Sequence, residues 1–104
     1  MLLLNIDYVP GREIAEALGV VKGTTVQSKN FGRDFMAGMK TLVGGEIVGY
    51  TEMLTEARQI AMKRMVDEAQ ALNADAVINV RFSSSSIMQG AAEVVAYGTA
   101  VRLA

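Results

Sequence analysis

Residues 93–103 offer two apolar faces if they form a β-strand, and no other feature constrains the fold as strongly. Successive side chains of a strand point to opposite sides of the sheet. One side would carry the smaller residues Val94, Ala96, Gly98 and Ala100. The opposite side would carry Val95, Tyr97, Thr99 and Val101. One side can pack on a helix, but the other then needs a second layer or another subunit. The sequence therefore predicts self-association.

A long helix is predicted over residues 51–73. Its apolar side chains recur at spacings of three and four, which places them on one helical stripe. The stripe consists of Leu54, Ala57, Ala61, Met65, Ala69 and Leu72. Its three alanines favour a close approach between this helix and the layer that it covers.

Polar residues of the same segment predict how the helix is stabilised and where it ends. Lys63 with Asp67 and Arg64 with Glu68 are opposite charges four residues apart, so each pair can meet on the helix surface. Asn73 is a residue type that accepts the left-handed conformation found after many helices.

The remaining segments are assigned from their periodicity and turn residues. The apolar and polar residues of 76–82 alternate, which places Ile78, Val80 and Phe82 on one face and Asn79 and Arg81 on the other. The other expected elements are strands over 2–6 and 20–26 (with a bulge at Gly23), helices over 12–18 and 30–42, a helix break at Gly44 and Gly45, and a loop over 83–91.

These elements predict a single α+β domain over residues 1–104. The expected architecture has two layers, with an antiparallel sheet packed on one long helix. One face of that sheet stays apolar and uncovered, so we expect the domain to form a homo-oligomer.

The composition excludes several classes of function. The chain has no Cys and no His, which removes disulfides, thiolate nucleophiles, Ser-His pairs and the commonest transition-metal ligands. Its net charge of −1 gives no positive field for nucleic acid, and no apolar run is long enough to cross a bilayer. We therefore expect a cytoplasmic protein without nucleic-acid or membrane partners.

Two polar groups are weak candidates for binding. Residues 83–86 are four serines, which with Gly90 could present hydroxyl and N–H groups to a phosphate; a solvated loop explains them better, because no P-loop lysine is present. Glu52 and Glu56 could hold a hard cation, but two carboxylates alone are usually solvated charges.

The ligand-binding candidates are Arg33, Asp34, Gly44, Gly45 and Arg81. The first two could contact an anion or a partner subunit, and the paired glycines would allow close backbone approach. Arg81 lies on a strand face with apolar neighbours, so its guanidinium needs an acceptor across an interface or in a pocket. Interface and ligand contact are equally supported for Arg81.

Several segments resemble the YbjQ-like family of small uncharacterised proteins. Residues 31–40 (FGRDFMAGMK) and 42–45 (LVGG) are similar to its FRDFFAGIRDIVGGR block, 73–77 to its GADAVV turn, and 98–101 to its terminal GTAV. The resemblance implies a two-layer fold of β-α-β-β type, related to dodecin-like subunits, and a ring-shaped homo-oligomer, a pentamer. The family also carries a heavy-metal-binding label. Glu46 departs from the family, where Arg is common, and the lack of Cys and His gives the metal label little support.

The expected function is therefore an oligomeric protein that binds a small ligand or metal ion at subunit interfaces, with no cofactor specified. A structural or protein-interaction scaffold is the alternative. An enzyme is not expected, because it would require groups such as Arg33, Asp34, Glu46 and Ser85 to converge in a pocket.

Overall fold

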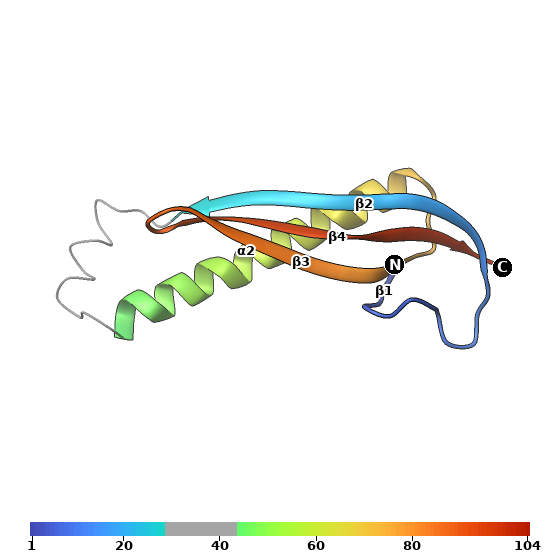
Figure 1. Ribbon diagram of the computed structural model, residues 1–104, viewed down its shortest axis with the longest axis horizontal. Helices are drawn as coiled ribbons and strands as arrows, with labels where there is room; N and C mark the ends of the chain where they lie inside the picture. Colours follow the sequence, from blue (N-terminus) through green and yellow to red (C-terminus); the bar gives the residue numbers. More distant parts are fainter. Residues whose placement is uncertain (29–43) are drawn as a thin grey trace.

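The computed structural model describes residues 1–28 and 44–104, with side chains from residue 49 onward in the second range. A four-stranded sheet and one long helix form two layers (Figure 1). The elements are β1 (Leu2–Leu3), β2 (Ile14–Ser28), α2 (Gly44–Ala71), β3 (Ala76–Met88) and β4 (Ala91–Leu103). The α+β class and the β-α-β-β order are confirmed, and the helix expected over 30–42 lies outside the described residues.

The strand order of the sheet is β1-β3-β4-β2. The two neighbours of β4 both run antiparallel to it, as expected. The short β1 is parallel to β3, with Leu2 opposite Ala76 and Leu3 opposite Val77, so the complete sheet is mixed. β2 is one edge of the sheet, and β1 covers part of the other.

The first half of β2 corrects the helix predicted over 12–18. The strand begins at Ile14, which lies opposite Leu103 of β4, and register shifts follow next to Glu16 and Gly19. These irregularities, and the exposure of this edge on both sides, remove the alternation that identifies a strand from its sequence.

The helix α2 begins at Gly44, earlier than predicted. Gly44 and Gly45 are therefore part of α2, and the helix over 30–42 that they were expected to end lies outside the described residues. At its other end Asn73 adopts a left-handed φ of 60°, and its N–H donates to the carbonyl oxygen of Gln70 at 3.0 Å. The predicted role of Asn73 is confirmed.

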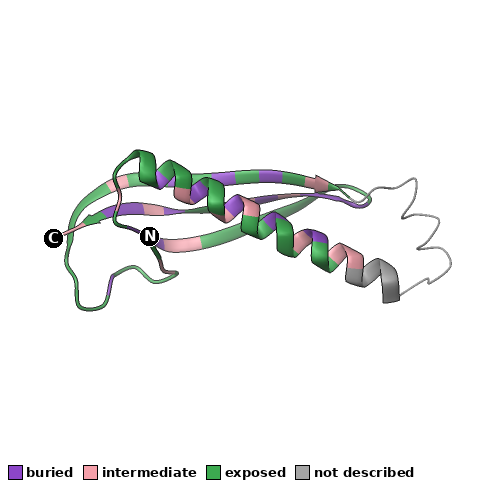
Figure 2. Cartoon of the chain, turned by 180° about the vertical axis from the view of Figure 1, so that it is seen from behind, coloured by how far each residue is buried: buried purple, intermediate pink, exposed green. Residues whose placement is uncertain are grey.

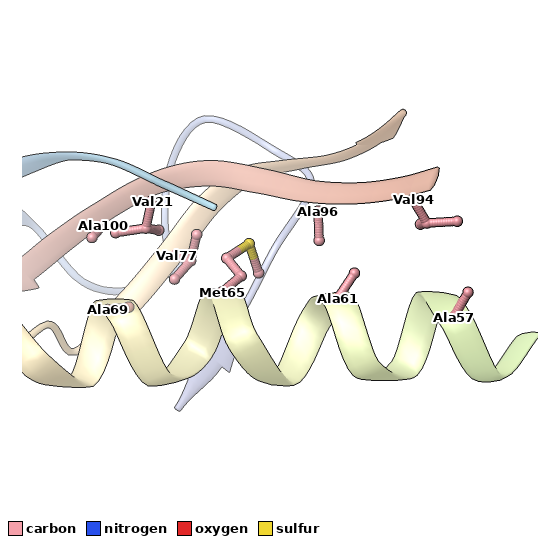
Figure 3. Close-up of a cluster of buried hydrophobic side chains, with 9 residues drawn as sticks. All are labelled: Val21, Ala57, Ala61, Met65, Ala69, Val77, Val94, Ala96 and Ala100. Atoms are coloured by element: carbon pink, nitrogen blue, oxygen red, sulfur yellow. The ribbon is translucent and has the colours of Figure 1, made fainter. Parts of the chain in front are cut away.

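The main core lies between α2 and the sheet (Figure 3). The predicted stripe faces this core, since Ala57, Ala61, Met65 and Ala69 are fully buried, whereas Leu72 is 42% exposed. They meet Val21, Val77, Val94, Ala96 and Ala100 of the strands. Alternate positions of β4 therefore pack on the helix, as the sequence predicted.

Gly23 marks the closest approach of α2 to β2. A Cβ at this position would overlap the carbonyl oxygen of Ala61 and the amide nitrogen of Met65, and would stand 2.8 Å from the Cβ of Arg64. The predicted bulge at Gly23 is wrong, because the residue pairs in regular register with Ala96. Gly23 is needed for the space that it leaves to the helix.

The serine run is part of β3, which corrects the loop predicted over 83–91. Ser84 lies opposite Val94, and the ladder continues to Ser86 opposite Ala92. The turn is reduced to Gln89 and Gly90, where Gly90 has a φ of 77°. Pairing with the apolar β4 outweighs the loop preference of serine.

A bulge in β3 changes which side chains share a face. Asn79 has a φ of 54°, and the register shifts between Ile78 and Arg81. Ile78 therefore packs in a second cluster, whereas Val80 packs against the main core. The prediction that Ile78, Val80 and Phe82 share one face is wrong for Ile78.

The second cluster lies on the side of the sheet opposite α2, near the chain termini. It contains Val9, Ala76, Ile78 and Val101, with Leu4 and Leu103 packed beside them. The N-terminal segment thus covers one end of the sheet face that the sequence left uncovered. The rest of that face carries the candidate site.

Candidate interface and ligand site

We call the sheet surface opposite α2, beyond the second cluster, the open face. In Figure 2 α2 crosses in front of the sheet, so the open face is the side turned away from the viewer; Figure 1 views the molecule from the side of the open face. The open face has four rows of side chains in cross-strand register. They are Val26, Glu93 and Ser85; Thr24, Val95 and Ser83; Lys22, Tyr97 and Arg81; and Val20 with Thr99.

Three apolar side chains on the open face are largely in contact with solvent. Val20 is 72% exposed, Val26 58% and Tyr97 40%. They lie on neighbouring strands, so they form part of one surface rather than isolated positions. A surface of this kind is typical of protein interfaces.

The central row of the open face places two cations beside an aromatic ring. Lys22 and Arg81 are the cross-strand neighbours of Tyr97 on either side. Nη1 of Arg81 donates to the carbonyl oxygen of Asn5 at 2.8 Å and to that of Val80 at 3.1 Å. These acceptors belong to the same chain, which corrects the expectation that Arg81 needs an acceptor across an interface or in a pocket.

Both acceptors of Arg81 are neutral, so its charge is not compensated by these bonds. The ion pairs among the described residues join Lys63 to Asp67 and Arg102 to Glu16. The guanidinium of Arg81 is thus held by hydrogen bonds and has no ion-pair partner in the part of the chain whose side chains are described, which are properties expected of an anion contact.

Of the five predicted ligand residues, Arg81 is the one whose side chain the structure describes. Arg33 and Asp34 lie outside the described residues. Gly44 and Gly45 form the first turn of α2. Lys22 and Tyr97 were not predicted as site residues, although alignment of the alternating residues in the predicted strands could have placed them beside Arg81.

Two backbone groups at the edge of β2 are bound by side chains of α2. The N–H of Lys22 donates to Oε1 of Glu68 at 3.2 Å, and Nη1 of Arg64 donates to the carbonyl oxygen of Thr24 at 2.7 Å. Arg64 and Glu68 therefore bind β2 and do not form the ion pair that was predicted between them. The other predicted pair, Lys63 with Asp67, is present at 3.0 Å.

The fold and the open face define a class of small α+β subunit that covers one side of its sheet with its own helix. Comparison with known proteins places the chain within that class. Residues 1–104 match a family described as "Putative heavy-metal-binding", and the chain belongs to this YbjQ-like family. The resemblance seen in the sequence is therefore confirmed.

Its relatives carry the general name UPF0145 protein. One from Clostridium novyi is 60% identical over 103 residues, covering 99% of both chains. One from Thermotoga maritima is 61% identical over 103 residues, covering 99% of this chain and 97% of the relative. These names identify the family and assign no reaction.

A solved structure from Pediococcus pentosaceus, described as a protein of unknown function in the DUF74 family, has a similar fold. The TM-score is 0.60 at 18% identity, over 100% of this chain and 98% of the other. The likeness supports the two-layer arrangement.

The family description implies a heavy metal, but the donor atoms of this chain do not fit one. Soft metals prefer thiolate and imidazole ligands, and the sequence has neither Cys nor His. Within residues 1–28 and 44–104, acidic residues do not form a group of three or more that could hold an ion.

In that same part of the chain, no helix is long and apolar enough to cross a membrane.

Proposed function

We propose that the protein is a binding protein and not an enzyme, and that it works as a ring-shaped homo-oligomer whose copies cover the open face. The exposure of Val20, Val26 and Tyr97 carries this proposal, because burial of apolar area is the main source of association free energy. The family resemblance implies five copies in each ring. The cytoplasm, expected from the sequence, is the proposed location.

We further propose that a small ligand or ion binds where copies meet, with Arg81 as its contact in the described part of the chain. The positive charges of Arg81 and Lys22, on either side of Tyr97, favour an anion over a metal cation. Arg33, Asp34, Gly44 and Gly45 remain the other proposed contacts.

A scaffold without a ligand is the second candidate. The bonds from Arg81 to Asn5 and Val80 favour it, because they give the guanidinium a structural role within its own chain. In this case the ring itself is the functional unit.

Native mass spectrometry tests the assembly. We expect multiples of the 11.1 kDa subunit at micromolar concentration, and a stable monomer would contradict the proposal. The variant Val26→Lys should weaken association at least about tenfold, which corresponds to about 1.4 kcal/mol. The control Leu72→Lys changes a residue that is 42% exposed at the end of the helix segment, and it should leave the assembly intact.

Small molecules released from the purified oligomer separate the two candidates. Reproducible recovery of one anionic compound by denaturing mass spectrometry favours the binding function, and its loss from Arg81→Gln would assign the site. An assembly that repeatedly releases no compound favours the scaffold.

A further inference from the structure

The two long outer edges of the sheet differ in how they are protected. On β2, Glu68 and Arg64 bind the outward-pointing N–H of Lys22 and carbonyl of Thr24. An added strand would have to displace both side chains. Natural proteins commonly cover edge strands in this way to prevent unwanted pairing.

The edge of β3 is protected over its first half only. The N–H of Leu4 donates to the carbonyl of Val77, and the N–H of Val80 donates to the carbonyl of Leu4, both at 2.9 Å. From Phe82 to Met88, no segment within residues 1–28 and 44–104 pairs with β3 on this side. This half of the strand is here called the bare edge.

Two observations agree on which residues of the bare edge point outward. The N–H of Val80 points away from β4. The direction of the backbone N–H and C=O groups alternates along a strand, so those of Phe82, Ser84 and Ser86 also point away from β4. On β2 the outward groups belong to Lys22 and Thr24. The partners of Lys22 and Thr24 on β4, Tyr97 and Val95, therefore direct their backbone groups toward β3. The backbone groups of Arg81 and Ser83 must then point toward β4.

The side chains of the bare edge carry none of the usual features that oppose pairing with another strand, and its register shift lies at the far end, between Ser86 and Met88. The segment from Phe82 to Met88 contains no charged residue and no proline, which are the usual devices against edge pairing. Three of its side chains are apolar and exposed: Phe82 at 42%, Ile87 at 54% and Met88 at 62%.

We propose that the bare edge pairs antiparallel with the bare edge of a second copy, about a two-fold axis at Ser85. Ser84 then lies opposite the partner's Ser86, and these residues exchange backbone hydrogen bonds on both sides of the axis. The regular pairing is centred on Ser84–Ser86, because the register of β3 with β4 shifts between Ser86 and Met88. Because the segment is uncharged, no like charges meet in this register.

The position of α2 supports this partner. In Figure 1 the N-terminal part of α2 extends beyond the outline of the sheet on the side of β3. Tyr50 and Leu54, in this part of α2, are half-buried. A strand added at the bare edge would lie over these turns and extend the layer above them.

This inference rests on the proposed self-association and adds a two-fold contact to it. A two-fold contact pairs copies, so the complete assembly contains an even number. A ring of five would therefore associate with a second ring to give ten copies.

The absence of cysteine from the chain allows a direct test with Ser85→Cys. At a non-hydrogen-bonded antiparallel pair the Cβ atoms lie about 4.5–5.5 Å apart, within reach of a disulfide after relaxation. Ser83→Cys is the matched control, because Ser83 lies on the same face and is also exposed. Its symmetry mate would be four residues away along the strands, about 13 Å, which is too far.

We expect mild oxidation to convert Ser85→Cys into a disulfide-linked dimer on a non-reducing gel and to leave Ser83→Cys monomeric on that gel. Equal cross-linking of both variants, or no cross-linking of Ser85→Cys in a protein that is oligomeric by native mass spectrometry, would overturn the bare-edge contact and leave the proposed function standing. A monomeric wild-type protein would overturn both.

Hydrogen exchange of the wild-type assembly gives a second measurement that needs no substitution. The amides of Ser84 and Ser86 should be protected at micromolar concentration and lose that protection when the assembly dissociates on dilution. Fast exchange of both amides in the intact oligomer would contradict the pairing.

Discussion

Gly23 of β2 lies directly against Ala61 of α2, so close that a single added methyl group would overlap the helix backbone. This contact brings α2 near enough for Arg64 and Glu68 to reach the outward groups of β2. The missing side chain thus determines both the packing of the two layers and the closure of one sheet edge.

Gly23→Ala should destabilise the protein by about 1–3 kcal/mol, because the overlapping atoms belong to the helix backbone and the layers must separate. Denaturation in urea, followed by circular dichroism, measures the change. Gln59→Ala, at an exposed position of α2, should change the free energy of unfolding by less than about 0.5 kcal/mol. Equal stability of Gly23→Ala and wild type would disprove the close approach.

The double variant Arg64→Ala, Glu68→Ala should open the edge of β2. Each lost hydrogen bond should cost about 1 kcal/mol or less, since both groups become accessible to water. The larger effect should be aggregation, measured by light scattering and thioflavin fluorescence at equal concentration. Lys63→Ala, Asp67→Ala removes the exposed ion pair one position earlier on the helix and should leave aggregation unchanged.

Arg81→Gln should loosen the N-terminal segment by weakening or removing the contact with the carbonyl of Asn5. Amides that hydrogen-bond between this segment and β3, such as those of Leu4 and Asn79, should exchange faster. Arg58→Gln is the control, since Arg58 is an exposed helix residue that contacts Thr55 of the same helix. Unchanged exchange at Leu4 would show that Arg81 does not hold this segment.

Titration with Zn²⁺ or Cd²⁺ should show no stoichiometric binding at micromolar metal. The expectation follows from the absence of Cys and His in the whole chain. Isothermal titration calorimetry of the metal-free native oligomer measures it, with a dicysteine peptide as the positive control. A saturable site with a Kd below about 1 μM would refute this prediction and support the family description for this chain.

Local sequence patterns predicted the elements whose burial follows one period. The stripe through Ala57, Ala61 and Met65 faces the core as expected, and so do alternate residues of β4 such as Ala96. The α+β class follows from these two patterns together.

Where tertiary contacts override local preference, the predictions failed. The first half of β2 is an exposed edge with bulges, so it lacks the alternation of a half-buried strand. The serines of β3 are held in a ladder by β4.

The candidate site was only partly predictable. Arg81 was identified from its strand position, but its bond to Asn5 joins residues 76 positions apart. The binding of Arg64 and Glu68 to β2 depends on the space above Gly23, which cannot be known before the two layers are placed. Arg33 and Asp34 stay predictions.

The bulge at Asn79 has a consequence for the rest of β3. One extra residue there resets the alternation, so that Ser83 and Ser85 share the open face while Phe82 points to the helix side. Deleting Asn79 would move each later side chain of β3 to the opposite face of the sheet. Phe82 would then lie on the open face, and Ser83 and Ser85 on the helix side. A single inserted amino acid thus decides whether hydroxyl groups or an aromatic ring meets whatever approaches that surface.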